Sequence, residues 1–320
     1  VYRFRPGHPA PDQPPTHQGL ERARPGPIPL NPGGTPVAGY MAGPGELPRP
    51  GIPEVYRRGG YLHPVLTPSG RAVTDDYPPN HIHHHGLWTA WTRTRFGTGA
   101  PDFWNMGERK GRVDFETLQT VERGPVFVGL TATHVHTSLL TNAPGIALHE
   151  TWRVRAYTPV EGTGYHVVDI ELAQRCATSQ PLDLLRYHYG GLGYRGPWAW
   201  NGADRAHYLD SNGSTNRVTA HGTRARWVWL GGQVDGALAG LAMLGHPSNF
   251  RAPQPLRVHP DEPFICWAPP QLGDFQIRPE EPYRARYRLV ALDGEPDPIL
   301  LDQLWADFAE PVRARPLGRR

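Results

Sequence analysis

Four of the chain's 16 histidines fall within five consecutive positions, in the run Asn80-His81-Ile82-His83-His84-His85-Gly86-Leu87-Trp88. Imidazole is the side chain that exchanges a proton near neutral pH, and it is also the commonest metal ligand. If the segment is extended, His81, His83 and His85 point to one side and His84 to the other. We interpret the cluster as the lining of a ligand site, and we take His83, His84 and His85 as candidate catalytic residues.

Two further sets of side chains could take part in proton transfer. His134 and His136 form an H-x-H pair on a predicted strand, which we interpret as a solvent-facing strand edge. Glu150 lies on the next predicted strand, where a buried carboxyl with a raised pKa opposite a histidine would be an acid–base partner. The alternative for Glu150 is a structural ion pair with Arg153. Glu108 is the second candidate catalytic carboxylate.

Three predicted loops combine aromatic rings with amide, basic or imidazole groups, which suits the stacking and hydrogen bonding of a sugar. The candidate substrate-binding residues in and beside them are Trp88, Trp104, Asn105, Tyr189, Arg195, His246 and Asn249. The glycines between Tyr189 and Arg195 lack the strand–turn–helix setting and the spacing of a nucleotide-binding fingerprint. Together the loops favour a polar, aromatic cleft over a flat binding face.

The composition disfavours a helical architecture for the elements that position these groups. Glycine and proline each number 37 among 320 residues, and both weaken helices. Alternating or continuous apolar patterns predict strands over residues 126–133, 148–157, 165–172, 224–230, 237–244, 264–267 and 283–292. One helix is expected after Asp297 as N-cap, because apolar residues recur at helical spacing from Leu300 to Phe308. The sequence therefore predicts a mostly β protein with a C-terminal helix.

The prolines are concentrated at the N-terminal end, where 14 of the 37 fall between Pro6 and Pro53. This predicts a Pro-rich arm over residues 1–36, a single β domain over residues 37–312 and a tail over residues 313–320. Either the arm links subunits into a homo-oligomer or an extended assembly, or it packs across the sheet of its own chain.

The charge is nearly balanced, with 33 Lys and Arg residues against 30 Asp and Glu, a net charge of +3. Such a weak field gives no reason to expect a nucleic-acid partner. The longest uncharged apolar run, residues 236–245, is about half of what a membrane span needs.

Cys176 and Cys266 match no metal-binding spacing and form either two thiols or one disulfide. Because Lys and Cys are scarce, we expect a secreted or periplasmic protein, with the cytoplasm as the alternative.

Several motifs occur together over residues 37–295, in the order Tyr61-Leu62-His63-Pro64, Thr67-Pro68-Ser69-Gly70, Asp76-Tyr77-Pro78-Pro79, His83-His84-His85-Gly86-Leu87-Trp88, Pro101-Asp102-Phe103-Trp104-Asn105-Met106-Gly107, Gly190-Gly191-Leu192-Gly193-Tyr194-Arg195 and His246-Pro247-Ser248-Asn249. In these motifs the chain resembles the PmoA-like bacterial domain family. The label of that family, methane oxygenase PmoA, denotes a membrane subunit with several spanning helices, so we interpret the label as a misannotation.

The resemblance implies an antiparallel β-supersandwich of the galactose-mutarotase type, with a sugar-sized groove on its concave face. It also implies bacteria that degrade polysaccharides as the source of such proteins. A mutarotase pairs a histidine acid with a glutamate base. The nearest equivalents in this sequence are His83 or His85 with Glu150.

These observations leave three hypotheses about function. The first is a carbohydrate-active protein without a cofactor, which binds a glycoside or modified sugar and transforms it by epimerisation, elimination or hydrolysis. In it, the histidine cluster works with Glu150 or Glu108 as acid and base. The second is a metal-dependent enzyme in which His81, His83 and His85 hold a divalent metal. The third is a non-catalytic extracellular binding or self-assembling protein whose Pro-rich arm links subunits.

Overall fold

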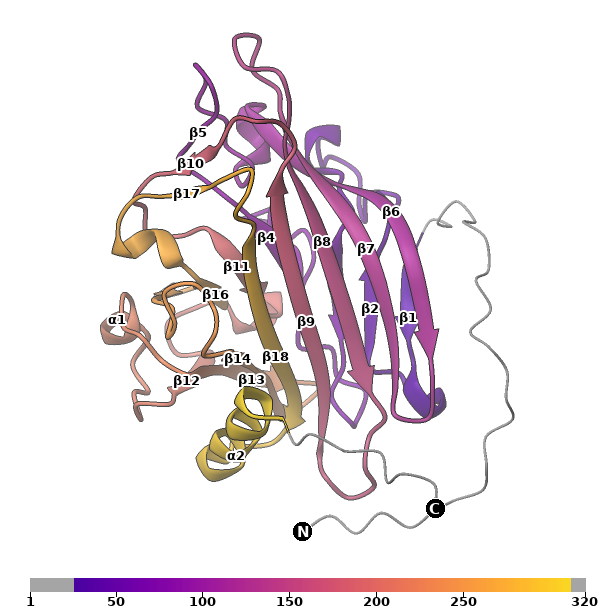
Figure 1. The fold of residues 1–320 in the computed structure, drawn as a ribbon. Helices are drawn as coiled ribbons and strands as arrows, with labels where there is room; N and C mark the ends of the chain where they lie inside the picture. The colour runs from indigo at the N-terminus through magenta and orange to yellow at the C-terminus, as the bar shows by residue number, and fades with distance from the viewer. Residues whose placement is uncertain (1–25, 312–320) are drawn as a thin grey trace, which may run out of the picture.

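The computed structural model describes residues 26–311, which form two large antiparallel sheets and one small sheet (Figure 1). The larger sheet consists of β6 (Gly111–Arg123), β7 (Phe127–Ser138), β8 (Gly145–Tyr157), β9 (Tyr165–Cys176), β12 (Ala206–Asp210), β13 (Trp227–Val234), β14 (Ala237–Gly245) and β18 (Tyr283–Asp293). Its strand order is β12-β13-β14-β18-β9-β8-β7-β6. The long strands β6 to β9 are consecutive neighbours, so short hairpin connections build this half of the sheet.

The second sheet has seven strands, and the third has three short ones. The seven-stranded sheet consists of β1 (Pro27–Leu30), β2 (Ala38–Met41), β3 (Tyr61–Val65), β4 (Leu87–Ala90), β11 (Gly191–Arg195), β15 (Leu256–Val258) and β16 (Phe264–Trp267). Its order is β1-β2-β3-β4-β11-β16-β15. The three-stranded sheet, in the order β17-β10-β5, consists of β5 (Thr94–Arg95), β10 (Leu182–Leu184) and β17 (Phe275–Ile277).

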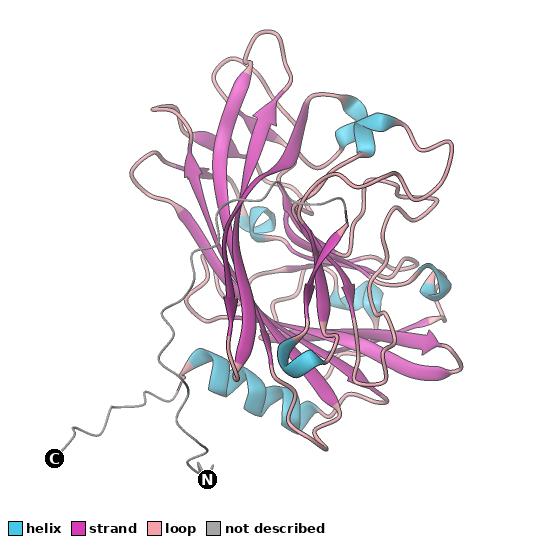
Figure 2. Cartoon of the chain, turned by 90° about the vertical axis from the view of Figure 1, so that its right-hand side faces the viewer, coloured by secondary structure: helices cyan, strands magenta, loops and turns pink. Residues whose placement is uncertain are grey.

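The two large sheets pack face to face, as Figure 2 shows in the view along their edges. Period-two alternation turns one face of each strand inward: Val128, Leu130 and Ala132 of β7 are buried, and so are Tyr283 and Tyr287 of β18. This confirms the mostly β, antiparallel sandwich predicted from the sequence. The strand predicted from residue 224 begins only at Trp227, after an isolated bridge between Arg224 and Pro255.

Helices are few and peripheral. The predicted C-terminal helix is confirmed as α2 (Pro298–Ala309), where the Asp297 carboxylate accepts a hydrogen bond from Ile299 N at 2.9 Å. Leu301 is fully buried against the outer face of the larger sheet, beside Trp227 and Val290. The shorter helices are α1 (Arg217–Ala220) and the 3₁₀ turns η1 (Pro32–Gly34), η2 (Glu54–Tyr56), η3 (Met106–Glu108), η4 (Trp198–Trp200) and η5 (Pro269–Leu272).

The sheet begins earlier than the sequence suggested. Strand β1 pairs antiparallel with β2, Pro27 opposite Met41 and Leu30 opposite Ala38, so residues 27–36 belong to the folded domain rather than to the arm. The remainder of the predicted arm, residues 1–25, and the tail after residue 311 lie outside the described residues. Cys176 and Cys266 are both free thiols. No helix within residues 26–311 is long and apolar enough to cross a membrane.

Candidate functional site

The histidine cluster lies in two successive turns, not in an extended strand. His81 N donates to Pro78 O at 3.1 Å, and His84 N donates to His81 O at 2.8 Å. The expected alternation is therefore wrong, because the turns bring His84 beside His81 and His83 and separate His85 from them. The ring centroids of His84 lie 4.8 Å from His81 and 4.6 Å from His83.

An aromatic floor supports these imidazoles. His84 stacks on Phe264 of β16 at 4.7 Å and lies 5.0 Å from Trp88 of β4, and Trp88 lies 5.0 Å from Trp104. Gly193 makes room for the floor, because a Cβ at this position would lie 2.9 Å from the Trp104 indole. All three supporting rings are buried, so they hold the polar groups above them and leave little apolar surface for a ligand.

A charged network stands beside the imidazoles. The fully buried Arg195 of β11 donates to Glu262 at 2.6 Å and to Asn201 at 3.0 Å. His81 Nδ1 lies 3.0 Å from Glu262 Oε2. Partial burial alone would raise the pKa of Glu262, but the hydrogen bonds and charges of His81 and Arg195 outweigh it and lower the pKa to about 2. Glu262 is therefore ionised near neutral pH.

Burial keeps the neighbouring imidazoles neutral. Desolvation, together with the adjacent His81 and His85, lowers the pKa of His83 to about 3. Burial also places the pKa of His84 well below its usual value, and His84 Nδ1 has no hydrogen-bond partner among the described residues. A neutral imidazole both donates and accepts one hydrogen bond, which suits the recognition of hydroxyl groups.

His85 belongs to a separate set of contacts. Its Nδ1 lies 2.7 Å from Asp76 Oδ1, and its ring packs against Tyr61 and Tyr77, each at 4.6 Å. Tyr61 also donates to Asp76 at 2.7 Å. Burial lowers the pKa of His85, although the hydrogen bond to Asp76 opposes the shift. This imidazole is fully buried, so its place is structural support behind the cluster.

Amide and phenol groups continue the polar surface on the other side of Trp104. Asn105 Nδ2 donates to Asp102 at 2.7 Å and to the Tyr189 hydroxyl at 3.0 Å. The Tyr189 ring lies 5.2 Å from Trp104. Asp102 also accepts from Trp104 N, so the loop carries its own internal hydrogen bonds. We define the histidine face as a set of partly exposed residues and the buried ones that contact them. The partly exposed residues are His81, His83, Asn105, Tyr189, Arg257, His259 and Glu262, and the buried ones are His84, Trp104 and Arg195.

Other predicted site residues lie elsewhere. Glu108 forms an exposed ion pair with Lys110 at 2.7 Å. His246 accepts from Ser248 N at 3.0 Å and packs its ring against Phe308 of α2, 5.0 Å between centroids. Asn249 exchanges hydrogen bonds with the backbone of Arg286 in β18. These last two residues close a turn on the larger sheet and are not brought to the histidine face.

Glu150 lies between the two large sheets and is fully buried. It accepts hydrogen bonds from Thr89 at 2.7 and 2.8 Å and from Gln174 at 2.8 Å, while His134 Nδ1 lies 3.0 Å away. Thr89 points to the opposite face of β4 from Trp88, since successive side chains alternate. The sheet therefore separates Glu150 from the histidine face.

Three expectations about this region are wrong. His134 and His136 are fully buried beside Glu150, not at a solvent-facing edge. Burial alone would raise the pKa of Glu150, but hydrogen bonds from the two histidines outweigh it and place the pKa well below its usual value. Arg153 pairs with Glu122 at 3.0 Å and not with Glu150.

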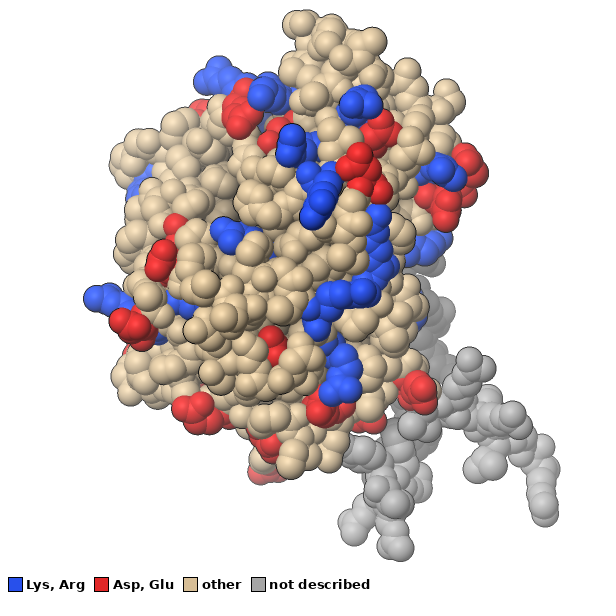
Figure 3. Space-filling model, turned by 90° about the vertical axis from the view of Figure 1, so that its left-hand side faces the viewer, with Lys and Arg blue, Asp and Glu red and all other residues tan. Residues whose placement is uncertain are grey.

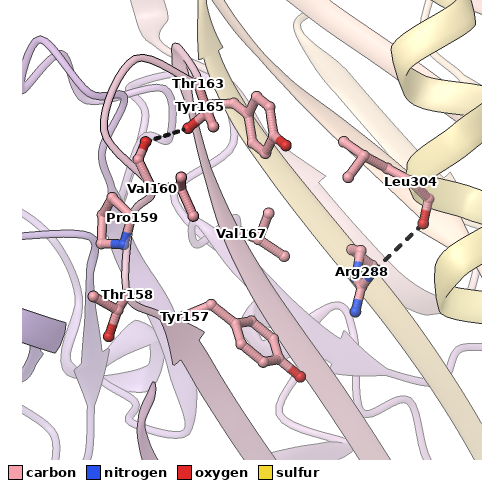
Figure 4. Close-up of a pocket in the computed structure, with 9 residues that line it drawn as sticks. All are labelled: Tyr157, Thr158, Pro159, Val160, Thr163, Tyr165, Val167, Arg288 and Leu304. Carbon is pink, nitrogen blue, oxygen red and sulfur yellow. Dashed lines mark hydrogen bonds between the residues drawn. The ribbon is translucent and has the colours of Figure 1, made fainter. Parts of the chain in front are cut away.

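Two hollows lie away from the histidine face. One, of about 200 Å³, lies between the β8–β9 connection and α2, where Arg288 donates to Leu304 O (Figure 4). Its charged group is already engaged, because Asp169 accepts two hydrogen bonds from Arg288. The second, of about 460 Å³, is lined by exposed groups that include Asp204, His207 and Glu295. Neither contains a buried charged network like that of Glu262.

Metal ligation and surface charge add two observations. Within residues 26–311, no three His, Cys, Asp or Glu side chains are placed to hold one metal ion, and the turns keep His85 apart from His81 and His83. On the side of the molecule shown in Figure 3, a short line of basic side chains is bordered by acidic ones, and the remaining charges are scattered.

Sequence reasoning missed Glu262, Arg257 and His259, which lie about 180 positions after the histidine cluster. The predicted strand over residues 264–267 places them near a strand end, but nothing in the sequence pairs that strand with β11. For His134 and His136 a signal did exist, because both continue the even-numbered positions of β7 whose apolar residues face the core.

The fold and the site define an antiparallel β-sandwich protein with a polar face of imidazole, carboxylate and guanidinium groups on an aromatic floor. The chain belongs to the family of unknown function DUF6807, whose model matches residues 28–306. No curated protein matches the sequence significantly. The family match therefore covers nearly all of the described residues and both large sheets.

Proposed function

We propose that the protein binds a carbohydrate or glycoside on the histidine face and transforms it by acid–base chemistry. The observation that carries the proposal is the pair of His81 and Glu262. The His81 side chain is 33% exposed while its Nδ1 contacts a carboxylate, and Arg195 holds that carboxylate from the other side. A partly exposed imidazole thus lies beside an ionised carboxylate that Arg195 also contacts.

The 3.0 Å contact between His81 Nδ1 and Glu262 supports one distribution of protons in this pair. A carboxylate beside Nδ1 favours the tautomer with the proton on Nδ1, which leaves the Nε2 lone pair for a substrate. The carboxylate also stabilises the imidazolium that forms when Nε2 accepts a proton. His81 is then the general base or acid, and Glu262 and Arg195 are positioning residues. The reaction is proton transfer at or next to the anomeric centre, in an epimerisation, elimination or hydrolysis.

The surrounding groups support a sugar as the ligand. His83 is partly exposed and neutral near pH 7, and Asn105 and Tyr189 offer an amide and a phenol, so the face presents donors and acceptors to several hydroxyl groups. The resemblance to the PmoA-like family and to mutarotase-type proteins favours the same class of ligand. Glu150 has no place in this proposal, because it lies on the other side of the sheet.

The test begins with titration calorimetry of the purified protein against methyl glycosides of gluco, galacto and manno configuration and their uronic acids. Turnover of any ligand that binds is then followed by NMR of the sugar. We expect His81→Gln to lower the turnover rate by about 100-fold or more, because general acid–base catalysis contributes on the order of 10²–10⁴-fold. His207→Gln, in the larger hollow, is the matched control and should leave turnover unchanged.

Either of two results would contradict the proposal. If none of the glycosides shows saturable binding, the carbohydrate assignment is wrong. If a bound glycoside is converted by His81→Gln at the wild-type rate, the sugar binds but the assigned base is wrong.

A further inference from the structure

Arg257 lies in the middle of the edge strand β15 and projects onto the histidine face. Its strand neighbours Leu256 and Val258 are fully buried on the opposite side of the sheet. Across the sheet, Arg257 pairs in register with Cys266, and Cys266 pairs with Gly193. Residues directly opposite each other on neighbouring strands lie on the same face of the sheet. Arg257 therefore lies on the sheet face that carries the aromatic floor.

This guanidinium has no carboxylate partner within residues 26–311. Its Nη1 donates to Val258 O at 3.2 Å, a contact with the adjacent residue of its own strand. Glu262 is the carboxylate whose charge acts on it, but Glu262 is already held by Arg195 and His81. Burial lowers the pKa of Arg257, which means that the guanidinium has lost part of its contact with water. It has no ion pair among the described residues that would compensate for this loss.

The other groups around Arg257 are neutral near pH 7. Burial raises the pKa of Cys266 to about 12 and that of Tyr189 to about 12, so both keep their protons. Burial, with a contribution from the charge of Arg257, lowers the pKa of His188 and of His259. Apart from Glu262, these groups around the positive charge of Arg257 are therefore uncharged.

The tautomer of His259 adds a donor to this part of the face. Its Nδ1 accepts hydrogen bonds from Asp261 N at 3.2 Å and from Glu262 N at 3.1 Å. A neutral imidazole that accepts at Nδ1 carries its proton on Nε2. The Tyr189 hydroxyl accepts a hydrogen bond from Asn105 Nδ2 at 3.0 Å and donates one to Asn105 Oδ1 at 3.3 Å, which continues the face toward Asn105.

We infer that the sugar bound on the histidine face carries a carboxylate, as a uronic acid does, and that Arg257 binds this group. The planar guanidinium presents a fork of N–H donors that matches the two oxygens of a carboxylate. The inference rests on the proposed function, since it names the class of sugar and the residue that selects it. His81 and Glu262 then lie on the same face as the acidic group and act on the ring next to it.

The test compares matched neutral and acidic ligands, namely the methyl glycosides of glucose, galactose and mannose against those of the corresponding uronic acids. Dissociation constants are measured by titration calorimetry at pH 7.5. For at least one pair, we expect wild-type protein to bind the uronate at least 10-fold more tightly than the neutral sugar. Arg257→Gln should abolish that preference and leave affinity for the neutral sugar within about twofold, whereas Arg257→Lys should retain part of it.

Arg175→Gln, an exposed arginine on β9, is the matched control and should keep the wild-type preference. If neutral and acidic members of every pair bind equally, or if Arg257→Gln keeps the preference, the assignment of Arg257 is wrong while carbohydrate binding stands. If no ligand of either kind binds, the proposed function fails and the inference fails with it. Thermal unfolding of each variant establishes that a lost preference is not a loss of folded protein.

Discussion

Two glutamates, the buried Glu150 and the partly buried Glu262, show how surroundings decide the role of a residue. Burial alone would raise the pKa of both carboxyl groups, but His134 and His136 lower that of Glu150, and His81 and Arg195 lower that of Glu262. Glu150 is fully enclosed between the sheets, whereas the Glu262 side chain keeps 12% exposure beside a partly exposed His81. Only the second arrangement leaves a partly exposed imidazole, so we assign Glu150 a structural role and, under the proposed function, Glu262 the positioning of His81.

Removing the Glu150 carboxylate should therefore affect stability and not binding. Glu150→Ala leaves His134, Thr89 and Gln174 without their shared acceptor. We expect the free energy of unfolding, measured in urea, to fall by about 3–5 kcal/mol, the cost of removing one partner from a buried charged pair. Glu161→Ala, at an exposed position, should change it by less than about 0.5 kcal/mol. A loss below about 1 kcal/mol for Glu150→Ala would contradict the structural role.

At the scale of elements, turns and strands decide which predicted residues meet. The two turns over residues 78–84 bring His81, His83 and His84 together, an arrangement that an extended segment would prevent. The pairing of β11 with β4 and β16 then brings Arg195 opposite Phe264 and beside the cluster. The site is thus a product of loop conformation on one sheet face.

Helix α2 covers the outer face of the larger sheet and should contribute strongly to stability. Leu301 is fully buried against that face, whereas Ile299 on the same helix is 70% exposed. We expect Leu301→Ala to lower the free energy of unfolding by about 2–5 kcal/mol, as buried leucines do. Ile299→Ala should stay within about 0.5 kcal/mol. Equal effects of the two substitutions would show that α2 does not pack as described.

Local sequence patterns predicted several strands and one helix, because alternation and helix capping depend only on residues close together in the sequence. Strands β7, β8, β9, β14, β16 and β18 and helix α2 follow from such patterns. The partner of His81 could not be predicted in this way, since Glu262 is 181 positions away and their contact depends on sheet order. The burial of His134 was predictable in principle, because it continues the inward face of β7, but its imidazole suggested a polar surface.

For the whole molecule, the buried imidazoles make stability depend on pH. Burial lowers the pKa of His84, His85 and His134, so the folded protein takes up fewer protons on these residues than the unfolded chain, whose histidines have a pKa of about 6.5. The unfolded state then binds more protons, and stability falls as the pH falls below about 6.5. The lowered pKa values of Glu150 and Glu262 act in the same direction, but only below their unfolded value near 4.5.

Urea unfolding at pH 7.5 and 5.5 should show this dependence. An imidazole that stays neutral in the folded protein lowers the free energy of unfolding by about 1.4 kcal/mol between pH 7.5 and 5.5. The free energy of unfolding is therefore expected to be lower at pH 5.5, and His84→Gln should reduce the difference by up to about 1.4 kcal/mol. Stability that is unchanged or higher at pH 5.5 would contradict the neutral state assigned to these residues.

The central claim is that a sugar binds on the histidine face and not in either hollow. The most direct test is ¹⁵N NMR of histidine-labelled protein, with imidazole signals assigned by single His→Gln variants, during titration with the glycosides and uronates named above. We predict that the signals of His81, His83 and His259 shift with the bound fraction while that of His207 stays in place. Saturable binding that shifts His207 and leaves the other three unchanged would contradict the claim.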